Sequence, residues 1–470
     1  MAVTSQSPHP TGSILNPRPG RWIDHYDPED RDQWESVGRR TARRNLWPSI
    51  FAEFLGFSVW QLWTIVTPQL NGVGFALTDN QKFWLIAIPN LVGATLRFPY
   101  TFAVPRFGGR NWTIISALLL VLPCVGLAIV VQNPQTPFWL LALVAASAGV
   151  GGGNFASSMA NISFFYPERE KGAALGLNAA GGNLGVAVVQ LVMPIVVVVG
   201  AGAAFASDGP ALHLAGLVVI PLALVAAVLA FLRMDNLSSA RADFAGYAAA
   251  MRNKHTWIIS FLYIGTFGSF IGYAGVFPLL IANTFPDVKF DWGFIGLAGI
   301  PLTLAFLGAL VGSLSRPYGG RLADRLSGAR VSIGAYVVMA VGAGGVILAL
   351  TRQSFPLFFG CFLLLFVATG MGNGSVYRMI PAIFRAGIDP EDKVSMTAAK
   401  REAAACIGLA AGIGAYGGFI VPRVFANSTV HFGSLIPALA VFIGFYAICA
   451  VVTWAVYLRG RTSRFAGTEI

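Results

Sequence analysis

The chain has 470 residues, of which 55% are apolar and only 11% are charged; its formal net charge is +11 and its mean hydropathy is +0.66. Roughly a quarter of the residues of an ordinary soluble domain are charged, so the charges here are too few to cover a soluble surface of this size. The composition therefore excludes a soluble globular protein and predicts a polytopic membrane protein surrounded by the lipid bilayer.

The first 46 residues are polar and contain several prolines. They have neither the short apolar stretch nor the small-residue cleavage site of a secretory signal peptide. We therefore expect a retained cytoplasmic tail over residues 1–46.

Twelve apolar stretches follow, and each is long enough to cross a bilayer as a helix, which takes about 20 residues. A polar linker over residues 234–254 divides them six and six. We predict an all-α membrane protein with an N-terminal six-helix bundle (47–233), a C-terminal six-helix bundle (255–459) and a C-terminal tail (460–470). The predicted spans are 47–70, 82–104, 111–131, 137–165, 171–200, 211–233, 255–283, 292–318, 329–350, 356–385, 396–424 and 433–458.

Basic residues fall in alternate connections between these spans. They precede the first span, follow the second, and continue on the same side up to the C-terminal tail, whereas the connections 71–81, 132–136 and 201–210 contain almost none. Because cytoplasmic loops carry the excess of Lys and Arg, both termini are expected in the cytoplasm. The net charge is thus a signal of membrane topology, and no nucleic-acid partner is expected.

The two predicted bundles contain similar sequence motifs at corresponding positions. Span two contains "LRFPYTFAVPRFGGR" and span eight "SRPYGGRLADRLSGAR", while "GVGGGN" begins at Gly149 in span four and "GMGNGS" at Gly370 in span ten. The arginine and the glycine string are separated by nearly the same stretch of chain in both halves. This duplication is typical of transporters whose substrate site lies at the interface between two repeats.

Arg97 in span two and Arg316 in span eight are the candidates for that site. An arginine at the centre of a span costs about 2.5–3.5 kcal/mol even on the lenient insertion scale, so each needs a compensating interaction. In one interpretation each side chain reaches the membrane interface or pairs with a carboxylate such as Asp324. In the other, the two cations face each other and an anionic substrate lies between them.

Other polar side chains within the spans leave their roles open. Glu53 is the only carboxylate clearly inside a predicted span, and it could pair with an arginine, take up a proton, or form a structural salt bridge. The amides of Asn154, Asn161, Asn178 and Asn183 could donate hydrogen bonds to an oxyanion or bond to neighbouring backbone.

Glycines recur at small-xxx-small spacings, which let helix backbones approach closely inside a membrane. We expect them to serve helix packing and the movement of helices during transport. The residues assigned to this role are Gly151, Gly153, Gly176, Gly185, Gly372, Gly408 and Gly412.

No sequence motif supports an enzyme. The string "GVGGGN" follows no strand and lacks the last glycine of a dinucleotide-binding loop, and no GxxxxGK[ST], HExxH or GxSxG motif is present. The four cysteines have no CxxC spacing and fall in apolar stretches. We therefore expect no enzymatic activity, no cofactor and no metal site.

The sequence resembles the nitrate/nitrite porter (NarK-like) family of the major facilitator superfamily over essentially the whole chain. "GGGNFASSMANISFFYPEREKGAALGLNAAGGNLGV" is similar to the first nitrate signature of that family and "GMGNGSVYRMIPAIF" to the second, while "GGRLADRLSGAR" is similar to the superfamily's loop motif. The resemblance implies two pseudo-symmetric six-helix bundles and a small anion held by one arginine from each half. The matching positions are Arg97 and Arg316, with Phe57, Phe155, Tyr263, Phe267 and Asn183 around them.

Nitrate and nitrite are therefore the expected substrates, moved by alternating access and most simply by exchange for each other. The protein is expected as a monomer in the bacterial cytoplasmic membrane. Proton-coupled nitrate symport through Glu53, transport of another small organic anion, and a nitrate sensor on a transporter scaffold remain alternatives. Three residues depart from the family pattern, namely Glu53, Arg378 and Ala411.

Overall fold

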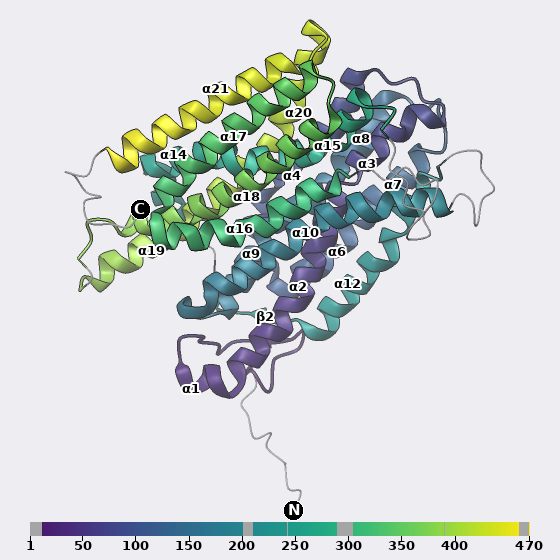
Figure 1. Cartoon of the computed structure of the whole chain (residues 1–470). Helices are drawn as coiled ribbons and strands as arrows, with labels where there is room; N and C mark the ends of the chain where they lie inside the picture. The colour runs from purple at the N-terminus through teal and green to yellow at the C-terminus, as the bar shows by residue number, and fades with distance from the viewer. Residues whose placement is uncertain (1–11, 201–209, 242, 289–303, 390, 460–469) are drawn as a thin grey trace, which may run out of the picture.

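The structure is a computed structural model that describes residues 12–200, 210–241, 243–288, 304–389, 391–459 and 470. Long helices run roughly side by side along one axis, and the two halves of the chain form two groups of helices that lie next to each other (Figure 1). This arrangement is the one expected when every backbone N–H and C=O of a membrane-spanning segment has to be satisfied within its own helix.

The first group of helices follows a short N-terminal segment. Its main helices are consecutive along the chain, and several are interrupted by a single non-helical residue. They are α2 (Arg39–Trp60), α3 (Trp63–Val66), η2 (Thr67–Val73), α4 (Asp79–Thr101), α5 (Ala103–Phe107), α6 (Gly109–Leu119), α7 (Val121–Val130), α8 (Phe138–Ser147), α9 (Gly149–Phe165), α10 (Glu168–Gly200), α11 (His213–Leu217) and α12 (Val219–Arg233).

The second group begins after a linker that contains α13 (Phe244–Arg252). Within its first span the helix passes through a five-residue π-helical stretch, η4. The elements are α14 (Lys254–Tyr263), η4 (Ile264–Gly268), α15 (Ser269–Thr284), α16 (Phe306–Leu326), α17 (Gly328–Thr351), α18 (Phe355–Arg385), α19 (Lys393–Ala415), α20 (Gly417–Phe432), α21 (Ile436–Thr453) and η6 (Trp454–Leu458).

Ten helical stretches of the described chain are long and apolar enough to cross a membrane. The two other predicted spans correspond to α4 and α16, the helices that carry Arg97 and Arg316. Charged residues lower the hydropathy of both helices, and residues 289–303, which include the expected start of span eight, lie outside the described chain. The two candidate arginines thus lie on described helices that are less apolar than these ten.

Some helix boundaries differ from the sequence prediction. Helix α2 starts at Arg39, eight residues before the predicted span, because the basic segment preceding the span continues the helix. Helix α13 lies within residues predicted as a polar linker; its first turn is capped by the Asp243 side chain, which accepts a hydrogen bond from the backbone N–H of Gly246. Helices α19 and α20 continue the eleventh span as far as Phe432, with a break at Tyr416.

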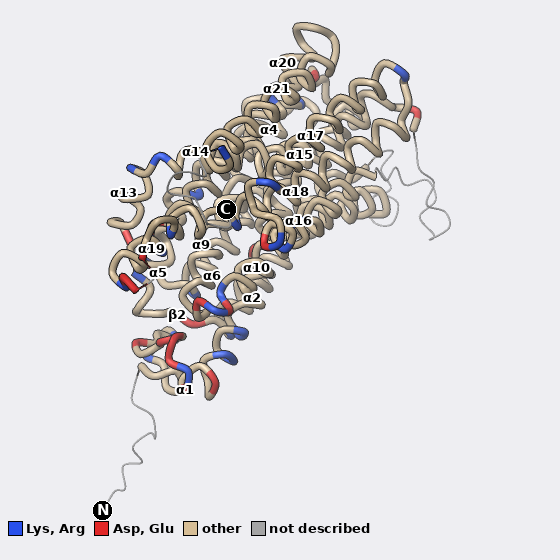
Figure 2. The backbone as a smooth tube through the Cα atoms, turned by 60° about the vertical axis from the view of Figure 1, so that its left-hand side comes forward, with Lys and Arg blue, Asp and Glu red and all other residues tan. Residues whose placement is uncertain are grey.

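The N-terminal segment packs against the linker at one end of the molecule, which we call the linker face: the end that carries α1 (Arg31–Gln33), β2 (Asn236–Leu237), α13 and the start of α19. Strand β1 (Trp22–Ile23) pairs in parallel with β2. Charged residues gather at this end of the helices, while most of the length of the bundle is uncharged (Figure 2).

Asp235 anchors the start of the linker to the first group of helices. Its carboxylate is fully buried and forms ion pairs with Arg21 at 2.7 Å and with Arg44 at 2.6 Å. Asn45 donates a further hydrogen bond to it at 2.9 Å. Because buried charges are stable only when paired and hydrogen-bonded, this cluster fixes the N-terminal segment, α2 and the linker to one another.

Candidate functional site

The glycine string of the first half brings α9 against the two helices that flank the site. A Cβ atom on Gly151 would lie 2.1 Å from the carbonyl oxygen of Gly56 on α2, and one on Gly153 would lie 2.8 Å from the Cβ of Leu96 on α4. Only glycine allows these approaches. The string therefore places α9 directly beside Arg97.

The glycine string of the second half has the same role on α18. A Cβ atom on Gly374 would lie 2.2 Å from the carbonyl oxygen of Arg316 on α16, and one on Gly372 would lie 2.7 Å from Cγ2 of Thr266 in η4. In each half, the glycine string thus packs on the first and second spans and positions the arginine of the second. The repeat seen in the sequence is also a repeat of geometry.

Arg97 is held firmly at the interface between the two groups of helices. Its side chain is 1% exposed, Nε donates to the carbonyl oxygen of Gly152 at 3.1 Å, and Nη1 donates to that of Ala411 on α19 at 2.8 Å. The third nitrogen, Nη2, is buried and has no hydrogen-bond partner in the described chain. One guanidinium nitrogen, Nη2, is thus left for a ligand.

Three aromatic rings enclose the Arg97 guanidinium. Its Cζ atom lies 4.7 Å from the ring centroid of Phe155, 5.3 Å from that of Trp60 and 5.3 Å from that of Phe267. Phe57 completes this wall from α2, with its ring 6.0 Å from the Phe155 ring. Cation–π contacts of this kind stabilise a desolvated guanidinium without neutralising its charge.

Arg316 has a looser environment. Its side chain is half-buried, Cζ lies 5.1 Å from the ring centroid of Tyr377, and the buried Nη1 has no hydrogen-bond partner among the described residues. Asp324, the carboxylate considered from the sequence as its partner, instead pairs with Arg378. In the described chain, neither Arg97 nor Arg316 forms an ion pair.

A continuous series of aromatic contacts joins the two arginines. From Tyr377, under Arg316, the ring of Tyr263 is 4.7 Å away; Tyr263 stacks on Phe267 at 5.3 Å, and Phe267 lies against Arg97. The two charges are close enough to interact electrostatically. The guanidinium groups predicted from opposite halves therefore share one aromatic-walled compartment.

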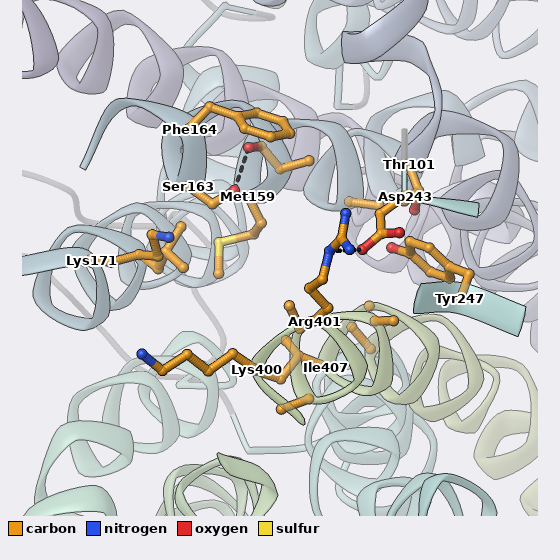
Figure 3. A pocket seen from close by; sticks show the side chains of 18 of the residues that line it. Thr101, Met159, Ser163, Phe164, Lys171, Asp243, Tyr247, Lys400, Arg401 and Ile407 are labelled. Atoms are coloured by element: carbon orange, nitrogen blue, oxygen red, sulfur yellow. Dashed lines mark hydrogen bonds and ion pairs between the residues drawn. The ribbon is translucent and has the colours of Figure 1, made fainter. Parts of the chain in front are cut away.

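A cavity of about 540 Å³ leads from this compartment to the linker face. Phe155, Tyr377 and Ala411 line its deep end. Near the mouth, Figure 3 shows Lys171 of α10 and Lys400 of α19 on the same side of the cavity, and Arg401 reaching the carboxylate of Asp243, 3.0 Å away. Arg241 and Arg385 also line the cavity, whose basic residues outnumber the acidic residues Glu168 and Asp243.

The opposite end of the interface, which we call the distal face, is closed by contacts between the two halves. Arg423 of α20 stacks on Trp84 of α4 at 4.0 Å and donates to Oδ1 of Asn80 at 2.9 Å. Deeper in the interface, Gln190 of α10 donates to the carbonyl oxygen of Ala274 on α15 at 2.7 Å. The described residues thus give the compartment an opening at the linker face and join the two halves to each other at the distal face.

The remaining predicted site residues lie at different places. Asn183 on α10 is buried, and its Oδ1 has no hydrogen-bond partner in the described chain; no hydrogen bond joins it to either arginine there. Glu53 on α2 is buried beside Asn178 and within electrostatic reach of both arginines. Arg378 is exposed and lies outside the compartment, where it forms an ion pair with Asp324 of α16.

Six of the seven glycines singled out from the sequence lie at close approaches to neighbouring residues, and Gly176 does not. A Cβ atom on Gly185 would lie 2.3 Å from the carbonyl oxygen of Phe54, one on Gly408 would lie 2.7 Å from the Tyr247 hydroxyl, and one on Gly412 would lie 3.1 Å from the Phe98 ring. The packing role expected of Gly176 is wrong for this conformation, because no atom lies within 4 Å of the position of its Cβ.

Sequence reasoning missed Tyr377 and Trp60. Tyr377 immediately precedes Arg378 in the second signature and occupies the place under Arg316 that Phe155 occupies under Arg97. Trp60 follows Phe57 by three residues, a spacing that places both on one face of α2. Helical spacing from the predicted aromatics would have found Trp60.

No metal site was expected from the sequence. Within the described residues, no group of three or more His, Cys, Asp or Glu side chains lies close enough together to hold a metal ion.

Residues 46–422 match the family described as Major Facilitator Superfamily. The chain is 40% identical over 457 residues to "Nitrate/nitrite transporter NarU" of Escherichia coli (strain K12), covering 93% of this chain and 96% of that protein. It is 36% identical over 471 residues to "Probable nitrate/nitrite antiporter NarK2" of Thermus thermophilus, covering 95% and 98%.

Among solved structures, the chain resembles the partially occluded inward-open conformation of the xylose transporter XylE from E. coli, with a TM-score of 0.63 at 15% sequence identity; the match covers 89% of this chain and 98% of that one. It also resembles a bacterial homologue of the human lysosomal transporter Spinster in an inward-facing and occupied conformation, with a TM-score of 0.61 at 14% identity, covering 87% and 95%. At these identities the likeness concerns the fold alone.

Proposed function

The chain belongs to the major facilitator superfamily, and on that premise we propose that it exchanges nitrate for nitrite across the bacterial cytoplasmic membrane by alternating access. The observation that carries the proposal is a pair of guanidinium groups, Arg97 and Arg316, joined by aromatic contacts in one buried compartment. Full-length relatives named as nitrate/nitrite transporters support the choice of anion.

The free donors suit a small planar oxyanion. Nη2 of Arg97 and Nη1 of Arg316 are buried and have no partner in the described chain, so each can donate to an oxygen of the anion. A guanidinium presents its N–H groups in one plane, which matches flat nitrate or bent nitrite better than the point charge of a lysine does. We propose that one anion bridges the two arginines.

The aromatic wall limits the size of the ligand and excludes water. Phe57, Phe155, Tyr263 and Phe267 are buried around the arginines, so a bound anion exchanges its hydration shell for fixed donors. In such a site, with less water and a lower effective dielectric than bulk solvent, an anion between two cations is held strongly. We propose that Asn183 adds an amide contact when the halves close.

Electrostatic repulsion explains why exchange is favoured over net transport. Without substrate, two guanidinium groups that share one compartment and form no ion pair in the described chain repel each other, which opposes closure of the compartment. A monovalent anion relieves this repulsion and allows the two bundles, 47–233 and 255–459, to rock around the site. Nitrate crossing in one direction is then followed by nitrite crossing in the other.

The distribution of basic residues supports a cytoplasmic linker face, with both termini on that side. The cavity then opens to the cytoplasm, and the contacts of Arg423 with Trp84 and Asn80 close the periplasmic side. Because both arginines come from one chain, the site is complete in a monomer.

Counterflow in proteoliposomes tests the proposal. The purified full chain is reconstituted, and uptake of labelled nitrate is measured with nitrite inside, with no anion substrate inside, and with an imposed pH gradient. We expect rapid uptake only when nitrite is inside. If a pH gradient drives nitrate uptake into vesicles that contain no nitrite, exchange is contradicted and proton symport is favoured. Nitrate binding without any flux would favour a sensor.

A further inference from the structure

Glu53 is a buried carboxylate that the proposed exchange mechanism does not use. It is 1% exposed, and its Oε1 has no hydrogen-bond partner in the described chain. Its polar neighbours are neutral side chains: Oε2 accepts a long hydrogen bond from Nδ2 of Asn178, at 3.5 Å, and the Ser158 hydroxyl also interacts with the carboxylate. Among the described residues no Lys or Arg nitrogen lies within 4.0 Å of it. A buried carboxylate with no ion pair is costly, and structural salt bridging does not explain it.

The fold makes room for this side chain. A Cβ atom on Gly182 of α10 would lie 2.8 Å from Cγ of Glu53 and 3.0 Å from its Oε1, so any larger residue would displace the carboxylate. The same atom would lie 3.2 Å from the ring of Phe57. Glu53 precedes Phe57 by one helical turn, and residues four apart share one face of a helix. The niche is therefore an extension of the aromatic wall of the site.

The charged groups within electrostatic reach of Glu53 are Arg97 and Arg316. Apart from α4, which carries Arg97, the helices packed on α2 have the charged residues of their described parts near the linker face, among them those in the first turn of α10. Helices α9 and α10 present Ser158 and Asn178, which hydrogen-bond to each other at 2.6 Å. Helices α6 and α12 also pack on α2, but they carry Arg110 and Arg233 at the linker face, where Arg110 bonds to the carbonyl oxygen of Gly20.

On the basis of the proposed function, we propose that Glu53 is the internal counter-ion of the arginine pair. Two guanidinium groups and one carboxylate leave a single positive charge, which one nitrate or nitrite ion cancels. With Glu53 ionised, the loaded compartment is neutral when the bundles rock across the bilayer. This accounts for a carboxylate that is near both arginines and bound to neither.

Protonation of Glu53 changes this balance. A proton from water in the cavity converts the carboxylate to a neutral acid, so the empty site has two positive charges and the loaded site has one. Anion binding then becomes tighter because a competing negative charge is removed. Crossing becomes slower because the loaded compartment is no longer neutral. Acidification should therefore lower the KM for the anion and also lower the maximal rate of exchange.

The test uses the full chain in proteoliposomes, with nitrate–nitrite counterflow measured at equal pH on both sides, from about pH 5.5 to about pH 8.5. At the acidic end of this range Glu53 is protonated and its negative charge is lost. The KM of the wild-type protein for nitrate is then expected to be about three- to tenfold lower than at the alkaline end, and the maximal rate is also expected to be lower. Glu53→Gln should show the acidic values at every pH. Glu53→Asp should keep the pH response, and Glu402→Gln, which removes a carboxylate outside the cavity, should match the wild type.

Two results would overturn the inference while leaving the proposed function intact. One is a wild-type protein that exchanges nitrate for nitrite with a KM independent of pH over this range, a result that requires no variant to fold. The other is a folded Glu53→Gln protein with the wild-type pH profile. Absence of any wild-type flux would instead refute the proposed function and this inference together.

Discussion

The two halves of the protein place an arginine in the same way but surround it differently. In both, a glycine string packs one helix against the second span of its half, beside Arg97 in the first and Arg316 in the second. Arg97 is fully buried and held by two carbonyl oxygens, whereas Arg316 is half-buried and rests on one aromatic ring. The two halves thus share the position of the cation but not its rigidity. We infer that Arg97 is the fixed anchor and Arg316 the partner that adjusts to the substrate.

Replacing the fixed anchor should have the largest effect. Arg97→Lys keeps the charge, but one ammonium group cannot bond to the carbonyl oxygens of Gly152 and Ala411 and also present a planar donor to the anion. We expect kcat/KM for nitrate exchange to fall about 100-fold, equivalent to about 2.7 kcal/mol. Counterflow with the reconstituted variant measures it, and near wild-type exchange would contradict the role of Arg97 as an anchor.

The glycine architecture gives the next largest effect. Gly151→Ala forces a methyl group against the backbone of Gly56, and overpacking of this kind costs about 1–3 kcal/mol. We expect a clearly lower melting temperature in detergent. Gly176→Ala is the matched control: its methyl group meets no atom within 4 Å and should leave the melting temperature unchanged or raise it slightly. Equal melting temperatures for the two variants would show that the close approach of α2 and α9 is not required.

Replacing the adjustable partner should have a smaller effect than replacing the anchor. A lysine at position 316 can still lie on the Tyr377 ring, and no described hydrogen bond depends on the guanidinium. We expect Arg316→Lys to lower kcat/KM about tenfold, or about 1.4 kcal/mol. A loss as large as that of Arg97→Lys in the same flux assay would remove the distinction between the two halves.

The smallest effect on transport is expected from replacing the aromatic residue that lies under Arg316, which is a tyrosine where the first half has a phenylalanine. Tyr377→Phe makes the second half resemble the first, in which Phe155 lies under Arg97. The Tyr377 hydroxyl is buried beside Tyr263, near the Arg316 guanidinium, and we propose that it donates to the bound anion. Its loss should raise KM about two- to fivefold, equivalent to less than about 1 kcal/mol. An unchanged KM for nitrate and for nitrite would exclude this contact.

The sequence was sufficient to predict the helical membrane fold and to single out Arg97 and Arg316 as candidates, because hydropathy, basic loops and charges inside apolar stretches are strong local signals. The aromatic residues Phe155, Tyr263 and Phe267 followed from the family resemblance. The contacts that join them depend on the angles at which helices cross. Those angles are set by close approaches such as that of Gly151 to Gly56, which a linear pattern does not contain.

Residues with two plausible environments could not be assigned from the sequence. Arg378 lies next to Tyr377, and only the position of Asp324 on α16 determines which of the two faces the site. The same limit applies to Asp235, which has the sequence context of an ordinary linker residue but is buried between Arg21 and Arg44. In both cases the partner is distant along the chain, and its position depends on the packed fold.

Calorimetric nitrate binding to the wild type, Arg97→Lys, Arg316→Lys and the double variant tests most directly whether both arginines hold one anion. If they do, the losses are not independent, and the double-mutant cycle should give a coupling energy of at least about 1 kcal/mol. Losses that add to within about 0.5 kcal/mol would mean that the two guanidinium groups act at separate places, which would contradict a single anion bridging them.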